Sequence, residues 1–105
     1  MFKSVLTDTV IAADNIPPKR FVGLDGTVGT GKEYGVTLYG GDKDRPMDVI
    51  VIGIAEVEVA NGQSVVPGDL VKANASGQAV KDNNNGKYVV KTGAVGGGFA
   101  EILIR

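Results

Sequence analysis

The stretch that decides the fold is Val49-Ile50-Val51-Ile52-Gly53-Ile54-Ala55-Glu56-Val57-Glu58-Val59. In its second half apolar side chains alternate with Glu56 and Glu58, so one face of an extended chain would be buried and the other wetted. Residues 49–52 are apolar throughout, which is typical of a strand covered on both faces. The stretch therefore predicts one β-strand with two buried faces at its start and one at its end.

Five further runs rich in Val, Ile, Tyr and Phe also predict strands. They are residues 20–24, 36–39, 70–73, 88–92 and 99–104. Between the runs, glycine follows Asp, Asn, Ser or another Gly, and such pairs favour tight turns because they tolerate positive φ. The predicted turns are Asp25-Gly26, Gly40-Gly41, Asn61-Gly62, Ser76-Gly77 and Asn85-Gly86. No segment keeps a helical apolar period without crossing Gly or Pro, so we expect very little helix.

A length of 105 residues fits a single domain, because two separate cores would each approach the lower size limit for stable folding. We predict an all-β fold, either a small β-sandwich or a β-barrel, with the β-domain over residues 16–105. Residues 1–15 precede Pro17-Pro18, which cannot donate ladder hydrogen bonds, and we expect an extended N-terminal arm there. The alternative for this segment is an ordinary first strand of the same sheet.

Charge and composition argue against several classes of partner. Eleven basic and twelve acidic residues give a net charge of −1, and neither sign forms a run, so the basic surface of a nucleic-acid binder is missing. Residues 4–13 lack both the basic region of a signal peptide and the long apolar span of a membrane helix. We therefore expect no nucleic-acid partner, no membrane partner and synthesis in the cytoplasm without passage through a secretion pathway.

The residue types available for chemistry predict no catalytic, metal or cofactor site. His and Cys are absent, so the commonest general base and the strongest nucleophile are missing, and only three serines remain to act as nucleophiles instead. Asp42, Asp44 and Asp48 are interleaved with basic residues and lack the spacing of a calcium loop, so we interpret them as a solvated connection. The Gly-Thr-Gly-Lys stretch at residues 29–32 lacks the Ser or Thr that completes a phosphate-binding loop.

Several stretches, taken in order, resemble a family of bacteriophage capsid decoration proteins, also called head cement or stabilising proteins. The family's Gly-Asp-x-Val…Gly-x-Ala-Val signature is similar to Pro67-Gly68-Asp69-Leu70-Val71-Lys72 followed by Gly77-Gln78-Ala79-Val80. Residues 16–22 resemble the opening strand of the family, residues 53–58 its central strand and residues 88–105 its ending. The resemblance therefore covers residues 16–105.

Two features depart from the family pattern. Residues 82–86 form a polar Asp-Asn-Asn-Asn-Gly tip where family members often carry Ala-rich and Gly-rich connections. Residues 1–15 lack a clear counterpart, which leaves the role of the arm open.

The resemblance implies a structural virion protein that binds the major capsid protein on the capsid exterior and stabilises the shell. It further implies homotrimers at threefold or quasi-threefold positions, where repeated weak contacts add up to tight binding, and it requires no cofactor. The apolar residues before the proline break suit a segment that orders on binding and adds a strand to a capsid edge. The capsid-contact candidates are Phe2, Val5, Leu6, Val10 and Ile11.

Three alternatives stay open at this point. Another phage virion component, such as part of a tail or a head fibre, shares the same chemistry and differs in its partner. A carbohydrate-binding or nucleic-acid-binding β-domain would need an aromatic or basic groove, which the composition does not suggest. An enzyme would need a cleft of convergent polar groups centred on Asp or Glu.

Overall fold

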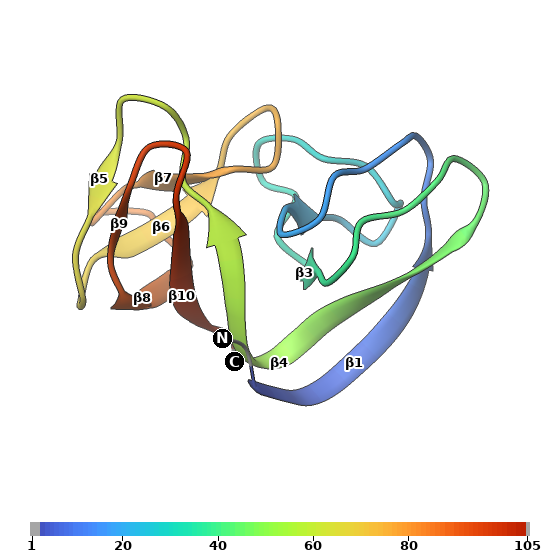
Figure 1. Ribbon diagram of the computed structural model, residues 1–105, viewed down its shortest axis with the longest axis horizontal. Helices are drawn as coiled ribbons and strands as arrows, with labels where there is room; N and C mark the ends of the chain where they lie inside the picture. The colour runs from blue at the N-terminus through green and yellow to red at the C-terminus, as the bar shows by residue number, and fades with distance from the viewer. Residues whose placement is uncertain (1–2, 105) are drawn as a thin grey trace.

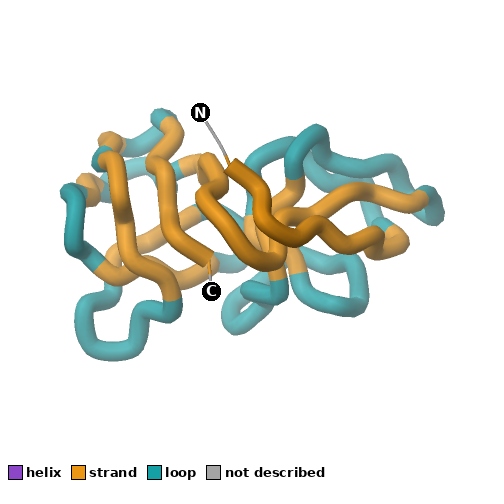
Figure 2. Tube along the Cα trace, turned by 90° about the horizontal axis from the view of Figure 1, so that it is seen from below, coloured by secondary structure: helices purple, strands orange, loops and turns teal. Residues whose placement is uncertain are grey.

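The computed structural model describes residues 3–104, and the side chains of residues 6–104. This range contains ten β-strands and no helix (Figure 2), and so no helix that could cross a membrane. The strands are β1 (Lys3–Ile11), β2 (Phe21–Val22), β3 (Gly35–Thr37), β4 (Pro46–Glu58), β5 (Ser64–Val65), β6 (Leu70–Ala73), β7 (Ala79–Lys81), β8 (Tyr88–Thr92), β9 (Ala94–Val95) and β10 (Phe99–Ile104).

The predicted strands are confirmed where β-branched and aromatic residues form a sustained run. β6, β8 and β10 begin and end where the sequence places them, and β2 and β3 overlap their predicted runs. β4 covers 13 residues, because it begins before the apolar run. The pattern does not predict β5, β7 and β9, because each is only two or three residues long.

The predicted glycine turns are largely confirmed by the backbone. Four of the six glycines in the five predicted turns have positive φ, and Gly41 and Gly86 do not. The four are Gly26, Gly40, Gly62 and Gly77, where the other residue types would meet the steric penalty of the left-handed region.

The main sheet is a nearly closed antiparallel barrel. Its strands follow the order β2-β3-β4-β10-β8-β6-β7, and β1 pairs with β4 outside this path. The ends of the path approach each other, because the Phe21 amide donates to the Gly77 carbonyl at 2.8 Å and Val59 forms a bridge with Ala79. Figure 1 shows β6, β7, β8 and β10 curling around one interior, with the separate β5–β9 pair beside them. Of the two predicted closures, the structure adopts the barrel.

Gly53 divides β4 into two parts with different surroundings. Before it, Val49 is buried in one apolar cluster and Ile50, on the opposite face, in another. After it, odd-numbered residues beginning with Ala55 enter the cluster that takes Ile50. Side chains alternate between the two faces of a regular strand, so a switch from even-numbered to odd-numbered residues on the core side requires an irregularity in the backbone. Gly53, with a φ of 130°, provides such an irregularity. The prediction of two covered faces is confirmed at Val49 and Ile50 and wrong at Ile52, which is 41% exposed.

The larger cluster, here called the barrel core, fills the closed part of the sheet. The rings of Phe21 and Tyr88 stack in it with centroids 6.1 Å apart. Burial raises the pKa of the Tyr88 hydroxyl, and the nearby charge of Glu33 raises it further. The buried members are Phe21, Val36, Ile50, Ala55, Val57, Val59, Val65, Val71, Ala73, Ala79, Tyr88, Val90, Ala100, Ile102 and Ile104.

The smaller cluster, here called the ribbon cluster, lies between β1, the first part of β4 and the loops that follow β1. Its buried members are Val10, Ala12, Ile16, Val22, Met47 and Val49. Val28, Tyr34 and Val51 pack against it and are only partly buried. The ribbon cluster therefore covers less apolar surface than the barrel core and has a more open boundary.

The N-terminal segment is a strand in this structure. β1 runs antiparallel to β4, from the pair Lys3–Ile54 to the pair Ile11–Pro46. Beyond β1, the Ala12 amide donates to a backbone carbonyl at 2.9 Å, which continues the pairing into the next loop. The described part of this segment thus lies along β4 as the first strand of the sheet. A separate role for residues 1–15 stays a prediction.

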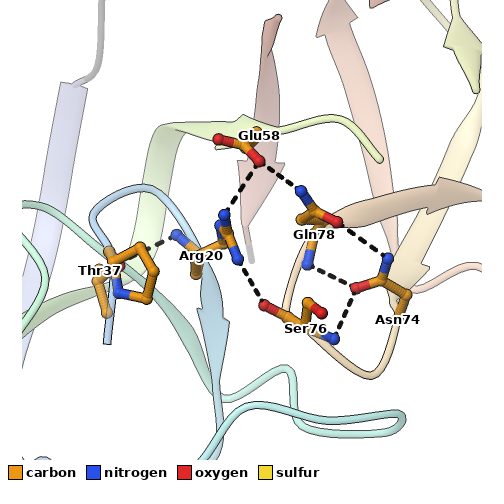
Figure 3. Close-up of polar contacts among 7 residues, drawn as sticks. Arg20, Thr37, Glu58, Asn74, Ser76 and Gln78 are labelled. Carbon is orange, nitrogen blue, oxygen red and sulfur yellow. Dashed lines mark hydrogen bonds and ion pairs between the residues drawn. The ribbon is translucent and has the colours of Figure 1, made fainter. Parts of the chain in front are cut away.

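A polar network, here called the seam network, spans the gap between β2 and β7 where backbone pairing stops (Figure 3). One Arg20 nitrogen lies 3.0 Å from a Glu58 oxygen, and another donates to the Ser76 carbonyl at 2.9 Å. The Gln78 side-chain amide donates to the same Glu58 oxygen, and the Gln78 backbone amide donates to Asn74 Oδ1 at 2.9 Å. The Arg20 and Glu58 side chains are only 16% and 23% exposed, so their attraction is partly shielded from water.

Candidate interaction surface

β1 and residues 46–54 of β4 form a two-stranded ribbon, here called the β1–β4 ribbon, which runs from the barrel along one side of the molecule (Figure 1). Its register shifts twice around Leu6, because each strand contains one additional residue there. Such irregularities increase the local twist and turn side chains away from their regular positions. Apolar side chains of the ribbon near these register shifts can therefore face water.

Two apolar cross-strand pairs are exposed on the ribbon. Leu6 is 50% exposed and pairs with Ile52. Ile11 is 55% exposed and pairs with the exposed Pro46. Directly opposed residues lie within side-chain contact of one another, so each pair forms one apolar spot. Exposed apolar surface gathered on one element is typical of a protein interaction site.

The structure separates the five residues predicted from the sequence to contact a capsid. Leu6 and Ile11 present their side chains to solvent. Val10 does not, because it is only 6% exposed and belongs to the ribbon cluster, so its side chain serves the fold. Phe2 lies outside the described residues, and so does the side chain of Val5.

The sequence pattern does not identify Ile52 and Pro46 as surface residues. Ile52 closes an apolar run that indicates burial on both faces, and Pro46 lies outside the predicted strand. A usable signal is present in the sequence, because a glycine within an apolar strand pattern often marks a bulge. Gly53 follows Ile52 directly and is the point at which the faces of β4 exchange.

A second exposed apolar surface, here called the β5–β9 surface, lies at the other end of the molecule (Figure 1). Val66 and Val95 are 55% and 66% exposed. The opposite face of this small sheet is covered, because Val65 is buried in the barrel core and Ala94 packs against it. Alternation along the strands therefore turns both exposed valines outward.

A groove of about 420 Å³ lies beside the loop that follows β2. Its two carboxylates have internal partners. Asp25 lies 2.5 Å from the Lys32 ammonium, which with Thr27 lowers the pKa of Asp25 to about 2. Glu33 accepts the Ala73 amide at 2.9 Å. The groove is lined by Gly23, Leu24, Asp25, Gly31, Lys32, Glu33, Tyr34 and Lys87.

These partners favour a structural role for the polar groups of the groove. Lys32, which ends the Gly-Thr-Gly-Lys stretch, is held by Asp25 rather than presented as a phosphate ligand. Asp42, Asp44 and Asp48 are all exposed, as expected for a solvated connection. Within residues 3–104 no group of three or more Asp or Glu side chains is placed to hold a metal ion.

The carboxylate of Asp8 is the main charged group on β1 beyond its first residue. The Tyr34 hydroxyl donates to one of its oxygens at 2.5 Å, and the Thr9 amide donates to the other at 2.8 Å. These two hydrogen bonds lower the pKa of Asp8, and the same contact raises the pKa of Tyr34. Asp8 is therefore ionised at neutral pH while its lone pairs are occupied by groups of this chain.

The ribbon and its exposed pairs acquire a context from known proteins. The amino-acid sequence matches the family described as phage cement protein over residues 2–102. The chain belongs to the phage cement protein family. The match includes β1, although the sequence motifs showed no clear counterpart for residues 1–15. No curated protein matches the chain. This cement protein is a structural component of a phage virion.

The fold of the cement protein is similar to that of a solved phage structure, "The crystal structure of head fiber gp8.5 N base in bacteriophage phi29". The two chains are 16% identical and superpose with a TM-score of 0.68. The similarity covers 100% of this chain and 95% of the other. The barrel and the β1–β4 ribbon therefore belong to a fold that another phage protein shares.

Proposed function

We propose that this cement protein binds the outer surface of a phage head through the β1–β4 ribbon and stabilises the assembled shell. The observation that carries the proposal is the pair of exposed apolar spots, Leu6 with Ile52 and Ile11 with Pro46, on one ribbon of a cement-family protein. The major capsid protein is the expected partner. The role requires neither a catalytic centre nor a cofactor.

Burial of the two apolar spots would supply much of the binding free energy. Apolar surface removed from water contributes about 25 cal/mol per Å², before the cost of ordering the two partners. A few side chains of this size give weak attachment per copy. A shell repeats the same junction many times, so a symmetric oligomer that engages several capsid subunits binds far more tightly than one copy.

We also propose homotrimers at threefold or quasi-threefold positions, as the family resemblance implies. The β5–β9 surface supports this arrangement, because Val66 and Val95 are exposed at the other end of the molecule and stay available when the ribbon is occupied. A neighbouring copy is the partner proposed for that surface. The mass of the purified protein in solution and on heads tests the stoichiometry.

Co-sedimentation with expanded heads assembled without this protein tests the proposal. The wild-type chain should bind in a saturable manner, and Leu6→Ser should weaken binding by about tenfold, because a leucine side chain contributes on the order of 1.5–3 kcal/mol when buried. Leu24→Ser is the matched control, since Leu24 is 71% exposed and lies outside the ribbon. Failure of the wild type to bind, or equal losses in the two variants, would contradict the proposal.

A head-fibre base is the second candidate function, favoured by the similarity of fold to the phi29 protein. Both candidates attach the barrel to a phage head, and they differ in what the barrel carries. Electron microscopy of heads that bear the native protein separates them. Compact protrusions at the attachment points support the cement role, whereas long fibres that start from the barrel support a fibre base.

A further inference from the structure

β1 has one edge without a partner strand. Among residues 3–104, β1 pairs with β4 and with no other strand. β3 and β10 both lie on the opposite edge of β4. β1 and β10 pair with the same residues, Gly53 and Ile54, and β1 and β3 both pair with Val49 and Ile50. The outer edge of β1 therefore faces away from the sheet. An unpaired edge is a template for the addition of another strand.

The hydrogen bonds next to β1 identify which backbone groups point outward. The Ala12 amide donates to the Arg45 carbonyl at 2.9 Å, so Ala12 faces the β4 side. The register is regular from Thr7 to Ile11, and successive residues of a strand present their backbone groups to opposite edges. Thr7 and Thr9 therefore direct their amides and carbonyls to the outer edge.

A loop limits the length of this open edge. The Ala13 amide donates to the Gly26 carbonyl at 3.1 Å, so the edge beyond β1 is already occupied. Gly26 lies so close that a Cβ atom on it would be 1.9 Å from the Ile11 carbonyl oxygen. The open part, here called the edge window, is thus residues 7–9.

Asp8 covers the centre of the edge window. The Thr9 amide donates to Asp8 Oδ1 at 2.8 Å, and the Tyr34 hydroxyl holds the other oxygen of the same carboxylate. Thr7, Asp8 and Thr9 are all exposed, so no other part of the described chain shields the window. A charged side chain on an open edge is a common device against unwanted strand pairing.

We infer that the edge window receives an extended segment of the major capsid protein as an added antiparallel strand. This inference rests on the proposed function and specifies how the ribbon binds. Thr7 and Thr9 each exchange hydrogen bonds with the incoming strand, while Leu6 and Ile11 pack beside it. Asp8 releases the Thr9 amide when the strand adds. A neutral residue of the incoming strand lies opposite Asp8.

Charge argues for a capsid segment rather than a second copy of this chain. Two copies that paired antiparallel through the same window would place their Asp8 residues directly opposite each other. Like charges in that position are destabilising. A strand of different sequence avoids this repulsion, and its backbone supplies the same hydrogen bonds.

A proline in the window tests the inference. Thr9→Pro removes the outward amide and leaves the ladder with β4 intact, since proline is tolerated on an edge strand when the lost amide faces outward. We expect at least about tenfold weaker co-sedimentation with heads, because one hydrogen bond is lost and a partner carbonyl is left unsatisfied. Thr9→Val is the matched control, which keeps the amide and should bind as the wild type does. If Thr9→Pro does not fold, Thr7→Pro carries the same test.

Removal of the Asp8 carboxylate gives a second readout. Asp8→Ala frees the Thr9 amide and should strengthen binding by a few fold, whereas Asp25→Ala, which alters an exposed acid outside the ribbon, should leave binding unchanged. Weaker binding of Asp8→Ala would overturn the capping role.

The outcomes separate this inference from the proposed function. Absence of wild-type binding to heads contradicts both. Wild-type affinity in Thr9→Pro, together with loss of binding in Leu6→Ser, leaves the proposed function standing and overturns strand addition. A change of solution mass in Thr9→Pro, without a change of affinity for heads, assigns the window to a second copy and also overturns the inference.

Discussion

The two ends of β4 illustrate how one strand serves two regions with different tasks. Beyond Gly53 it contributes to a barrel core of fifteen buried residues, surrounded by paired strands. Before Gly53, Met47 and Val49 contribute to a ribbon cluster of six, bounded on one side by the edge strand β1, while Ile50 on the opposite face still enters the barrel core. The barrel core holds the fold together, and the ribbon cluster positions the surface that we propose meets the capsid.

This difference in burial predicts a difference in local stability. Regions with few buried apolar contacts open more readily than the core to which they are attached. The ribbon should therefore loosen without unfolding of the barrel, whereas loss of the barrel core should unfold both.

Phe21→Ala should have the largest effect, because Phe21 is fully buried in the barrel core and stacks on Tyr88. Truncation of a buried Phe costs about 3–5 kcal/mol of unfolding free energy. Urea unfolding measures this loss. Phe99→Ala is the control, since Phe99 is 45% exposed, and it should cost less than about 1 kcal/mol. Similar losses in the two variants would contradict the assigned core.

Met47→Ala should destabilise the ribbon cluster selectively. Met47 is 3% exposed, and truncation at such sites costs about 2–5 kcal/mol, with the lower end expected where neighbours can relax into the space. Amide hydrogen exchange should accelerate in β1 and stay unchanged in β8. Met47→Leu conserves volume and should behave almost as the wild type does. Uniform acceleration over the whole chain would show that the two regions unfold as one unit.

Arg20→Met tests the seam network, which joins the ends of the barrel. It removes the cation from Glu58 while preserving much of the side-chain volume, and the loss of hydrogen bonds to a charged group costs about 1.5–3 kcal/mol. Thermal unfolding measures the change. Adding Glu58→Gln to both backgrounds isolates the coupling between the two residues. If the effects of the two changes on stability are additive, the Arg20–Glu58 pair does not stabilise the contact between the ends of the barrel.

Acid should produce the smallest effect, through Asp25 in the loop after β2. The Lys32 ammonium and Thr27 lower the pKa of Asp25 from 3.8 to about 2, so this contact stabilises the fold at pH values above 3.8. The contribution disappears as the pH falls through 2. An NMR titration of the Asp25 carboxyl should show this low pKa, and Asp25→Asn should remove its part of the pH dependence of melting. An Asp25 pKa at or above 3.8 would contradict the contact.

The strands were predictable wherever local sequence determines them. β8 and β10 are rich in β-branched and aromatic residues over five and six positions, and that composition alone indicates an extended chain. The pairing of β1 with β4 joins segments about forty residues apart, so no local pattern contains it. The two-residue β5 and β9 exist only because they pair with each other.

The candidate surface was only half predictable for the same reason. Apolar character identified Leu6 and Ile11, but it also selected Val10, because composition does not tell an exposed apolar residue from a buried one. Ile52 lies next to the register shift between the pairs Leu6–Ile52 and Thr7–Ile50, and that irregularity depends on the pairing with β1. The seam network likewise joins Arg20 and Glu58, which are 38 positions apart.

Hydrogen exchange of the protein bound to expanded heads, compared with the free protein, tests whether the β1–β4 ribbon meets the capsid. We expect slower exchange of backbone amides in residues 6–11 and 46–52, with little change in the loops around the groove. The Thr9 amide should show the largest protection. Unchanged exchange along β1, with protection confined to the groove loops, would show that a different face meets the capsid and would contradict the account.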